Sequence, residues 1–156
     1  MGYTEDSAEY QVVLDRLKRK FMRAATLVPA PVVEGSGQSG VGLIAFGSSH
    51  GATREAMDIL ARRGITVDYL RIRSFPFTKE VEAFLASHSK IFVIEQNRDA
   101  QMRSLLTLET AVEKAKLSSI LHYSGLPISS SVIVDGVAAE VGEGRKPSVS
   151  VVPGRK

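Results

Sequence analysis

The sequence predicts an α/β protein, a three-layer α/β/α fold around a mostly parallel sheet of four to five strands. Short apolar segments alternate with segments of helical periodicity, and short links join them. This alternation is typical of strand–helix units joined by right-handed crossovers. Two segments, 41–46 and 91–95, are almost continuously apolar, as expected of strands that helices cover on both faces.

The elements follow one another in a regular order. The predicted strands are 41–46, 66–72, 91–95 and 119–123. The predicted helices are 52–63, 79–87, 100–115 and 130–139. Gly64 is a typical stop for the first of these helices, and Asp99 is placed to cap the third. The stretch ISSSVIV near the last helix would also suit a strand.

Three zones of composition divide the chain. Within residues 7–26, apolar side chains recur at three- and four-residue spacing; these side chains are Tyr10, Val13, Leu14, Leu17 and Phe21. This spacing predicts an amphipathic helix whose apolar face needs a partner. Two prolines and the run GSGQSG follow, which is typical of a linker. We therefore expect a helix and Pro/Gly/Ser linker in 1–40, the α/β domain in 41–140 and a basic, disordered tail in 141–156.

Composition excludes several classes of protein. The 156 residues include no Cys, so disulfides, thiolate metal sites and cysteine nucleophiles are ruled out. No apolar run approaches the about 18 residues of a membrane span, and the first residues lack a signal-peptide core. We expect a cytoplasmic protein without a membrane partner.

Charge and histidine spacing exclude two further kinds of site. The net charge of +3 comes largely from Arg145, Lys146, Arg155 and Lys156 in the tail. Nucleic-acid proteins instead gather basic groups on a folded face, so we expect no nucleic-acid partner. His88 and His122 have no neighbour at metal-ligand spacing, and we predict no metal site.

Loops at the carboxyl ends of the parallel strands are the expected ligand region of such a sheet. The turn Gly47–Gly51 opens a helix, where free N–H groups favour an anion, although a serine-capped tight turn has the same pattern. Two arginines alternate at the end of strand 66–72 and suit an ion pair or an acidic ligand. The candidate anion-binding or interface residues are Gly47, Ser48, Ser49, His50, Gly51, Arg71, Arg73 and Asn97.

The same turn also matches the G-x-S-x-G pattern of a serine nucleophile. Ser49, Asp99 and His122 follow one another in the order of an α/β-hydrolase triad. That fold needs about eight strands and an oxyanion loop before the nucleophile, whereas a helix and a linker precede this strand. A serine hydrolase is therefore the less favoured alternative.

Two stretches carry a family resemblance: GLIAFGSSHGATREAMDILARRGITVDYLRIRSFPF and IFVIEQNRDAQMRSLL. They resemble the C-terminal domain of the alpha subunit of 2-oxoacid:ferredoxin oxidoreductases, most of all the 2-oxoglutarate type. The family's Glu-x-Asn-x-x-Gly-Gln motif matches Glu95, Asn97 and Gln101, with Ala100 in place of the glycine. The resemblance spans about residues 3–138. Within it, the opening stretch YTEDSAEYQVVLDRLKRKF resembles the segment that links this domain to the preceding one.

The resemblance implies a fold similar to the transketolase C-terminal domain. Family members oxidatively decarboxylate a 2-oxoacid to its acyl-CoA and use thiamine diphosphate, Mg²⁺ and iron–sulfur clusters. It implies that this chain is a non-catalytic scaffold and interface domain that binds none of these cofactors alone. Its implied partners are the other alpha-subunit domains and the thiamine-diphosphate-binding beta subunit, with ferredoxin and coenzyme A reached through the complex.

Two alternatives stay open beside this resemblance. One is a free-standing α/β module that binds a small anionic ligand at the Ser48–Gly51 turn. The other is the serine hydrolase. The sheet architecture alone does not choose among these functions, because it hosts many.

Overall fold

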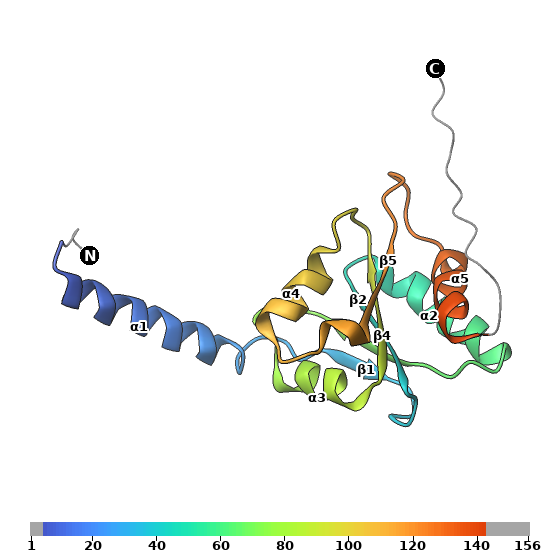
Figure 1. Cartoon of the computed structure of the whole chain (residues 1–156), viewed down its shortest axis with the longest axis horizontal. Helices are drawn as coiled ribbons and strands as arrows, with labels where there is room; N and C mark the ends of the chain where they lie inside the picture. Colours follow the sequence, from blue (N-terminus) through green and yellow to red (C-terminus); the bar gives the residue numbers. More distant parts are fainter. Residues whose placement is uncertain (1–4, 143–156) are drawn as a thin grey trace, which may run out of the picture.

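The structure, a computed structural model, describes residues 5–142 and confirms the predicted α/β fold (Figure 1). The disordered tail predicted for 141–156 lies almost wholly outside the described residues. The helices are α1 (Ser7–Ala24), α2 (Ser49–Arg62), α3 (Lys79–Ser87), α4 (Gln101–Glu109) and α5 (Ser130–Val141), with one 3₁₀ turn, η1 (Lys114–Lys116). The strands are β1 (Val32–Glu34), β2 (Val41–Phe46), β3 (Asp68–Ile72), β4 (Lys90–Glu95) and β5 (Leu117–Leu121).

The five strands form one sheet in the order β1-β3-β2-β4-β5. β2, β3, β4 and β5 run parallel, and β1 pairs antiparallel with β3 at the edge. β3 and β4 lie on opposite sides of β2. After β2 the chain forms β3 on one side and then crosses over to form β4 on the other side. The strand order therefore reverses between β2 and β4, and a ligand crevice in such a sheet is expected at their carboxyl ends.

Helices cover both faces of the sheet, and the alternation of side chains along β2 sets the two halves of the core. Leu43 and Ala45 belong to the apolar cluster under α2 and α5. Ile44 belongs to the cluster under α3 and α4. Figure 1 shows these two helix pairs on opposite sides of the sheet. Because β2 is buried on both faces, its sequence is apolar at nearly every position.

Strand β1 lies in the segment for which the sequence predicts only a linker. Val33 pairs with Leu70 of β3, and Glu34 forms an ion pair with Arg54 of α2 at 3.1 Å. Three residues are too few to show the period of a strand. The local sequence therefore does not predict β1, which forms by pairing with β3. The division of the chain at residue 40 stays a prediction.

Helix α4 is shorter than the predicted helix 100–115. It ends at Glu109, and Thr110 is extended, with its hydroxyl donating to the Leu106 carbonyl at 2.7 Å. The chain leaves the helix here because Val112 and Leu117 pack into the apolar cluster of this face. β5 consequently begins at Leu117, two residues before the predicted strand 119–123.

Helix α1 extends away from the sheet (Figure 1), and none of its residues is buried. Asp6 caps it by accepting from the N–H groups of Ala8 and Glu9. Near its other end, the ring centroids of Phe21 and Phe75 are 5.7 Å apart. No helix within residues 5–142 combines the length and apolarity needed to cross a bilayer.

Candidate functional site

The loops after β2 and β4 meet at the carboxyl edge, where the strand order reverses. Gly47 ends β2 with φ +58, a conformation that glycine adopts without strain. Ser48 is the N-cap of α2, but its side chain does not cap the helix. Within residues 5–142 the turn therefore gives α2 no cap from its own N-cap side chain, and an anion-binding role for Gly47–Gly51 stays a prediction.

The side chain of Gln96 joins the loops at this edge. Its Nε2 donates to the hydroxyl oxygens of Ser48 at 2.9 Å and Ser49 at 3.2 Å. Its Oε1 accepts from the N–H of Ile128 in the loop between β5 and α5 at 3.1 Å. Sequence reasoning missed Gln96, although its place directly after a buried strand and beside Asn97 was a usable signal.

Glu95, at the end of β4, caps helix α4. The residue is fully buried. Its Oε2 accepts from Met102 N at 2.7 Å and Asn97 Nδ2 at 2.8 Å, and its Oε1 accepts from Arg103 N at 3.0 Å. A carboxylate at this position satisfies orphan donors of the helix and opposes the positive end of its dipole.

The prediction that Asp99 caps α4 is wrong. Asp99 is exposed and forms an ion pair with its neighbour Arg98, at 2.7 Å. Asn97 instead accepts, through Oδ1, from the N–H groups of Asp99 at 3.0 Å and Gln101 at 3.4 Å. Glu95 is six residues before the helix, so local spacing could not identify it as the cap.

Ala100 is strained at the start of α4, and glycine should relieve that strain. It is a non-glycine residue with φ +51, where the Cβ crowds the backbone. We expect Ala100→Gly to raise the free energy of unfolding by about 0.5–1 kcal/mol, measured by urea denaturation. Ala83→Gly, on an exposed face of α3, is the matched control and should lower it by about 1 kcal/mol. Equal losses in both variants would contradict this account.

His50 and Arg71 come together around the buried Tyr69 of β3. His50 Nδ1 lies 3.0 Å from the Tyr69 hydroxyl, and the two rings are stacked. Burial raises the pKa of Tyr69 to about 12; the charge of Arg71 opposes this rise, the charge of Glu34 adds to it, and the charge of Arg54 lowers it least. Tyr69 is therefore a neutral hydroxyl at physiological pH.

The two arginines of β3 and its following loop have different environments. Within residues 5–142, the Arg71 guanidinium forms no hydrogen bond or ion pair. Arg73 Nη1 donates to the Ala30 carbonyl at 3.4 Å, and the neighbouring Ser74 hydroxyl donates to the Pro29 carbonyl at 2.7 Å. Arg73 thus holds the segment after α1 against the sheet, whereas Arg71 is available to an acidic group.

The predicted triad is not assembled. Ser49 is buried and accepts from Gln96, while Asp99 is paired with Arg98. His122 Nε2 lies 3.0 Å from the Leu126 carbonyl and 2.9 Å from the Ser124 hydroxyl, so it contacts its own loop and neither Ser49 nor Asp99. No contact joins the three residues in the described part of the chain, and the serine-hydrolase alternative has no support in the side-chain geometry.

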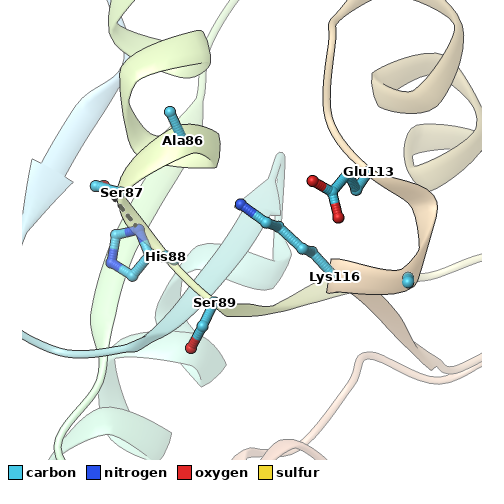
Figure 2. A pocket seen from close by; sticks show the side chains of 7 residues that line it. Ala86, Ser87, His88, Ser89, Glu113 and Lys116 are labelled. Atoms are coloured by element: carbon cyan, nitrogen blue, oxygen red, sulfur yellow. Dashed lines mark hydrogen bonds between the residues drawn. The ribbon is translucent and has the colours of Figure 1, made fainter.

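A surface hollow lies elsewhere, near the amino ends of the strands. Figure 2 shows Glu113 and Lys116 on one side of this hollow and Ser87 with His88 on the other. None of the predicted site residues lines it. Across residues 5–142, no three His, Asp or Glu side chains are grouped in a way that could hold a metal ion.

Residues 40–126 match the family model described as pyruvate:ferredoxin oxidoreductase core domain II. This range is more than half of the chain and includes the four parallel strands. It also contains both loops of the carboxyl edge described above.

Three relatives illustrate the similarity. The alpha subunit of 2-oxoacid:ferredoxin oxidoreductase 2 from Aeropyrum pernix is 30% identical over 152 residues, which is 92% of this chain. The alpha subunit of the 2-oxoacid:ferredoxin oxidoreductase from Saccharolobus solfataricus is 29% identical over 147 residues, or 91% of this chain. A solved structure of 2-oxoglutarate:ferredoxin oxidoreductase from Magnetococcus marinus, with 2-oxoglutarate, coenzyme A and succinyl-CoA bound, covers 86% of this chain at 27% identity and a TM-score of 0.76.

These matches confirm the resemblance drawn from the motifs. The chain spans only 23% of the length of each of these three proteins. What it shares with them is therefore one domain of a much longer subunit.

Proposed function

The chain belongs to the pyruvate:ferredoxin oxidoreductase core domain II family, and from this we infer that it is the scaffold and interface domain of a 2-oxoacid:ferredoxin oxidoreductase alpha subunit. The family match over residues 40–126 is the observation that carries the proposal. In this proposal the domain is inert alone, and the complete enzyme oxidatively decarboxylates a 2-oxoacid to its acyl-CoA. The Magnetococcus marinus relative, which has 2-oxoglutarate and succinyl-CoA bound, supports 2-oxoglutarate as the substrate.

The residues of this chain do not fit the cofactors of such an enzyme. Iron–sulfur clusters are held by Cys thiolates, and the sequence contains no Cys. Within residues 5–142 there is also no group of three carboxylates or histidines for Mg²⁺. We therefore assign thiamine diphosphate, Mg²⁺ and the clusters to the other alpha-subunit domains and the beta subunit.

Hydrogen bonds join the loops at the carboxyl edge of the sheet. Glu95 fixes the start of α4, and Gln96 ties the loop after β2 to the loop after β5. Arg71, which lacks a partner in the described residues, gives this part of the domain a free cation for an acidic group of a neighbour. Such fixed loops suit a surface that positions other domains.

Reconstitution tests the proposal. The chain is coexpressed with a thiamine-diphosphate-binding beta subunit and the remaining alpha-subunit domains, and the same set is expressed without it. We expect native mass spectrometry to show a defined complex, and 2-oxoglutarate-dependent reduction of ferredoxin to require the chain. Pyruvate is the matched control substrate and should give slower reduction. A complex that forms and reduces ferredoxin equally well without the chain would contradict the proposed function.

A further inference from the structure

Helix α1 carries an apolar stripe that is only partly covered by the described residues 5–142. Its members are separated by four, three and four residues, the repeat of a coiled-coil helix. All of them are about half exposed, and we call them the seam; they are Tyr10 (56%), Leu14 (46%), Leu17 (49%) and Phe21 (47%). No residue of the helix is buried by the described part of the chain, and a half-exposed apolar stripe of this size indicates a docking surface.

The seam is continuous with the body of the domain. The Phe21 ring lies 5.7 Å from that of Phe75, and Phe75 meets Phe77 edge-on at 5.2 Å. Phe77 packs against the core cluster under α3 and α4. The hydrogen bond from Ser74 to Pro29 fastens the segment that follows the helix. The domain therefore holds the end of α1 in place.

Basic side chains flank the seam. A surface hollow beside Phe21 is lined by Leu17, Lys18, Lys20 and Ala24. On a helical projection, Lys18 and Lys20 lie on opposite sides of the Leu17–Phe21 line. Neither lysine forms an ion pair within residues 5–142.

We propose that the seam binds an apolar helix flanked by acidic side chains in a neighbouring domain or subunit of the enzyme. The proposal rests on the proposed function and specifies the chemistry of the partner. Pairing of charges beside an apolar seam selects the partner of a coiled-coil helix. A second copy of α1 does not meet this requirement, because its own positions beside the seam carry no acid; they are Gln11, Val13, Lys18 and Lys20.

Two synthetic peptides probe this chemistry directly. Both place Leu at each seam position of a 21-residue helix, and they differ only in carrying Glu or Lys at the flanking positions. Fluorescence anisotropy measures their binding to the full chain. We expect the Glu peptide to bind at least about tenfold more tightly than the Lys peptide at low salt. High salt should reduce this preference, because exposed charges are screened.

Variants of α1 separate the seam from general effects of charge. Leu17→Asp should weaken binding of the Glu peptide by at least about tenfold. The double variant Lys18→Glu with Lys20→Glu should reverse the preference between the peptides. Arg19→Glu is the matched control, because its side chain lies opposite the seam on the helical projection, and it should leave the preference unchanged. Circular dichroism checks that every variant stays folded.

Three results would overturn the inference. They are equal binding of both peptides, an Arg19→Glu effect as large as that of the lysine variants, and a dimer of this chain in sedimentation that Leu17→Asp abolishes. Reconstitution separates this inference from the proposed function. A complex that the lysine variants leave intact would refute the seam alone, whereas selective peptide binding without any enzyme complex would refute the proposed function alone.

Discussion

Replacing Glu95 with alanine is expected to lower the free energy of unfolding by about 3 kcal/mol, because the change leaves several buried donors without an acceptor. The N–H groups of Met102 and Arg103 and the amide of Asn97 all donate to this carboxylate. Glu95 is fully buried, so these donors lie away from bulk water in the folded protein. Urea denaturation followed by circular dichroism measures the loss.

Two further variants make the prediction about Glu95 specific. Glu95→Gln keeps one acceptor oxygen and should lose less stability than Glu95→Ala. Asp99→Ala removes the carboxylate that the sequence places at the cap, yet this side chain is exposed, so we expect a loss within about 0.5 kcal/mol. A larger loss in Asp99→Ala than in Glu95→Ala would refute the assignment of the cap.

Replacing Asp68 with asparagine is expected to cost about 3 kcal/mol at neutral pH, because it breaks a buried ion pair. Asp68 and His88 are almost fully buried, and Asp68 Oδ2 lies 3.2 Å from His88 Nε2. The other ring nitrogen of His88 lies 2.7 Å from the Phe84 carbonyl. The backbone N–H groups of Gly37 and Ser39 also donate to the Asp68 carboxylate, at 3.0 Å and 3.1 Å.

The cost of Asp68→Asn should depend on pH. Burial alone would raise the pKa of Asp68, but hydrogen bonds from Gly37, His88 and Ser39 outweigh it and hold the pKa below its usual value. The stabilisation is complete above the unfolded-state pKa of about 3.9 and is lost as the pH falls through the lower folded-state pKa.

Unfolding curves between pH 7 and pH 3 test this dependence. The difference in stability between the wild type and Asp68→Asn should shrink as the pH falls below 4, since the wild-type carboxylate becomes protonated there as well. Asp58→Asn, at an exposed position of α2, is the matched control and should change stability by less than about 0.5 kcal/mol at every pH. A constant difference for Asp68→Asn across this range would show that its charge does not stabilise the fold.

The amphipathic and apolar segments of the sequence determined the class of the fold. β2 and α3 lie where the sequence predicts them, and the residues near 130–139 form helix α5. These segments are long enough for their period to identify them, and the two-sided burial of β2 and β4 explains their continuous apolar character. The family motifs around Gly47 and Asn97 are likewise local in sequence, and both lie inside the range 40–126 of the family match.

Tertiary structure decided the elements and contacts that depend on distant parts of the chain. β1 has three residues and exists because β3 pairs with it. The cap of α4 comes from Glu95 in the preceding strand, Gln96 reaches Ser48 across 48 positions, and His88 finds Asp68 across 20. A local pattern records the period of a helix or strand, but a hydrogen bond between remote residues forms only after the sheet has brought the strand ends together. The sequence by itself therefore determined the fold class and the family, and the tertiary structure decided which side chains support the edge of the domain.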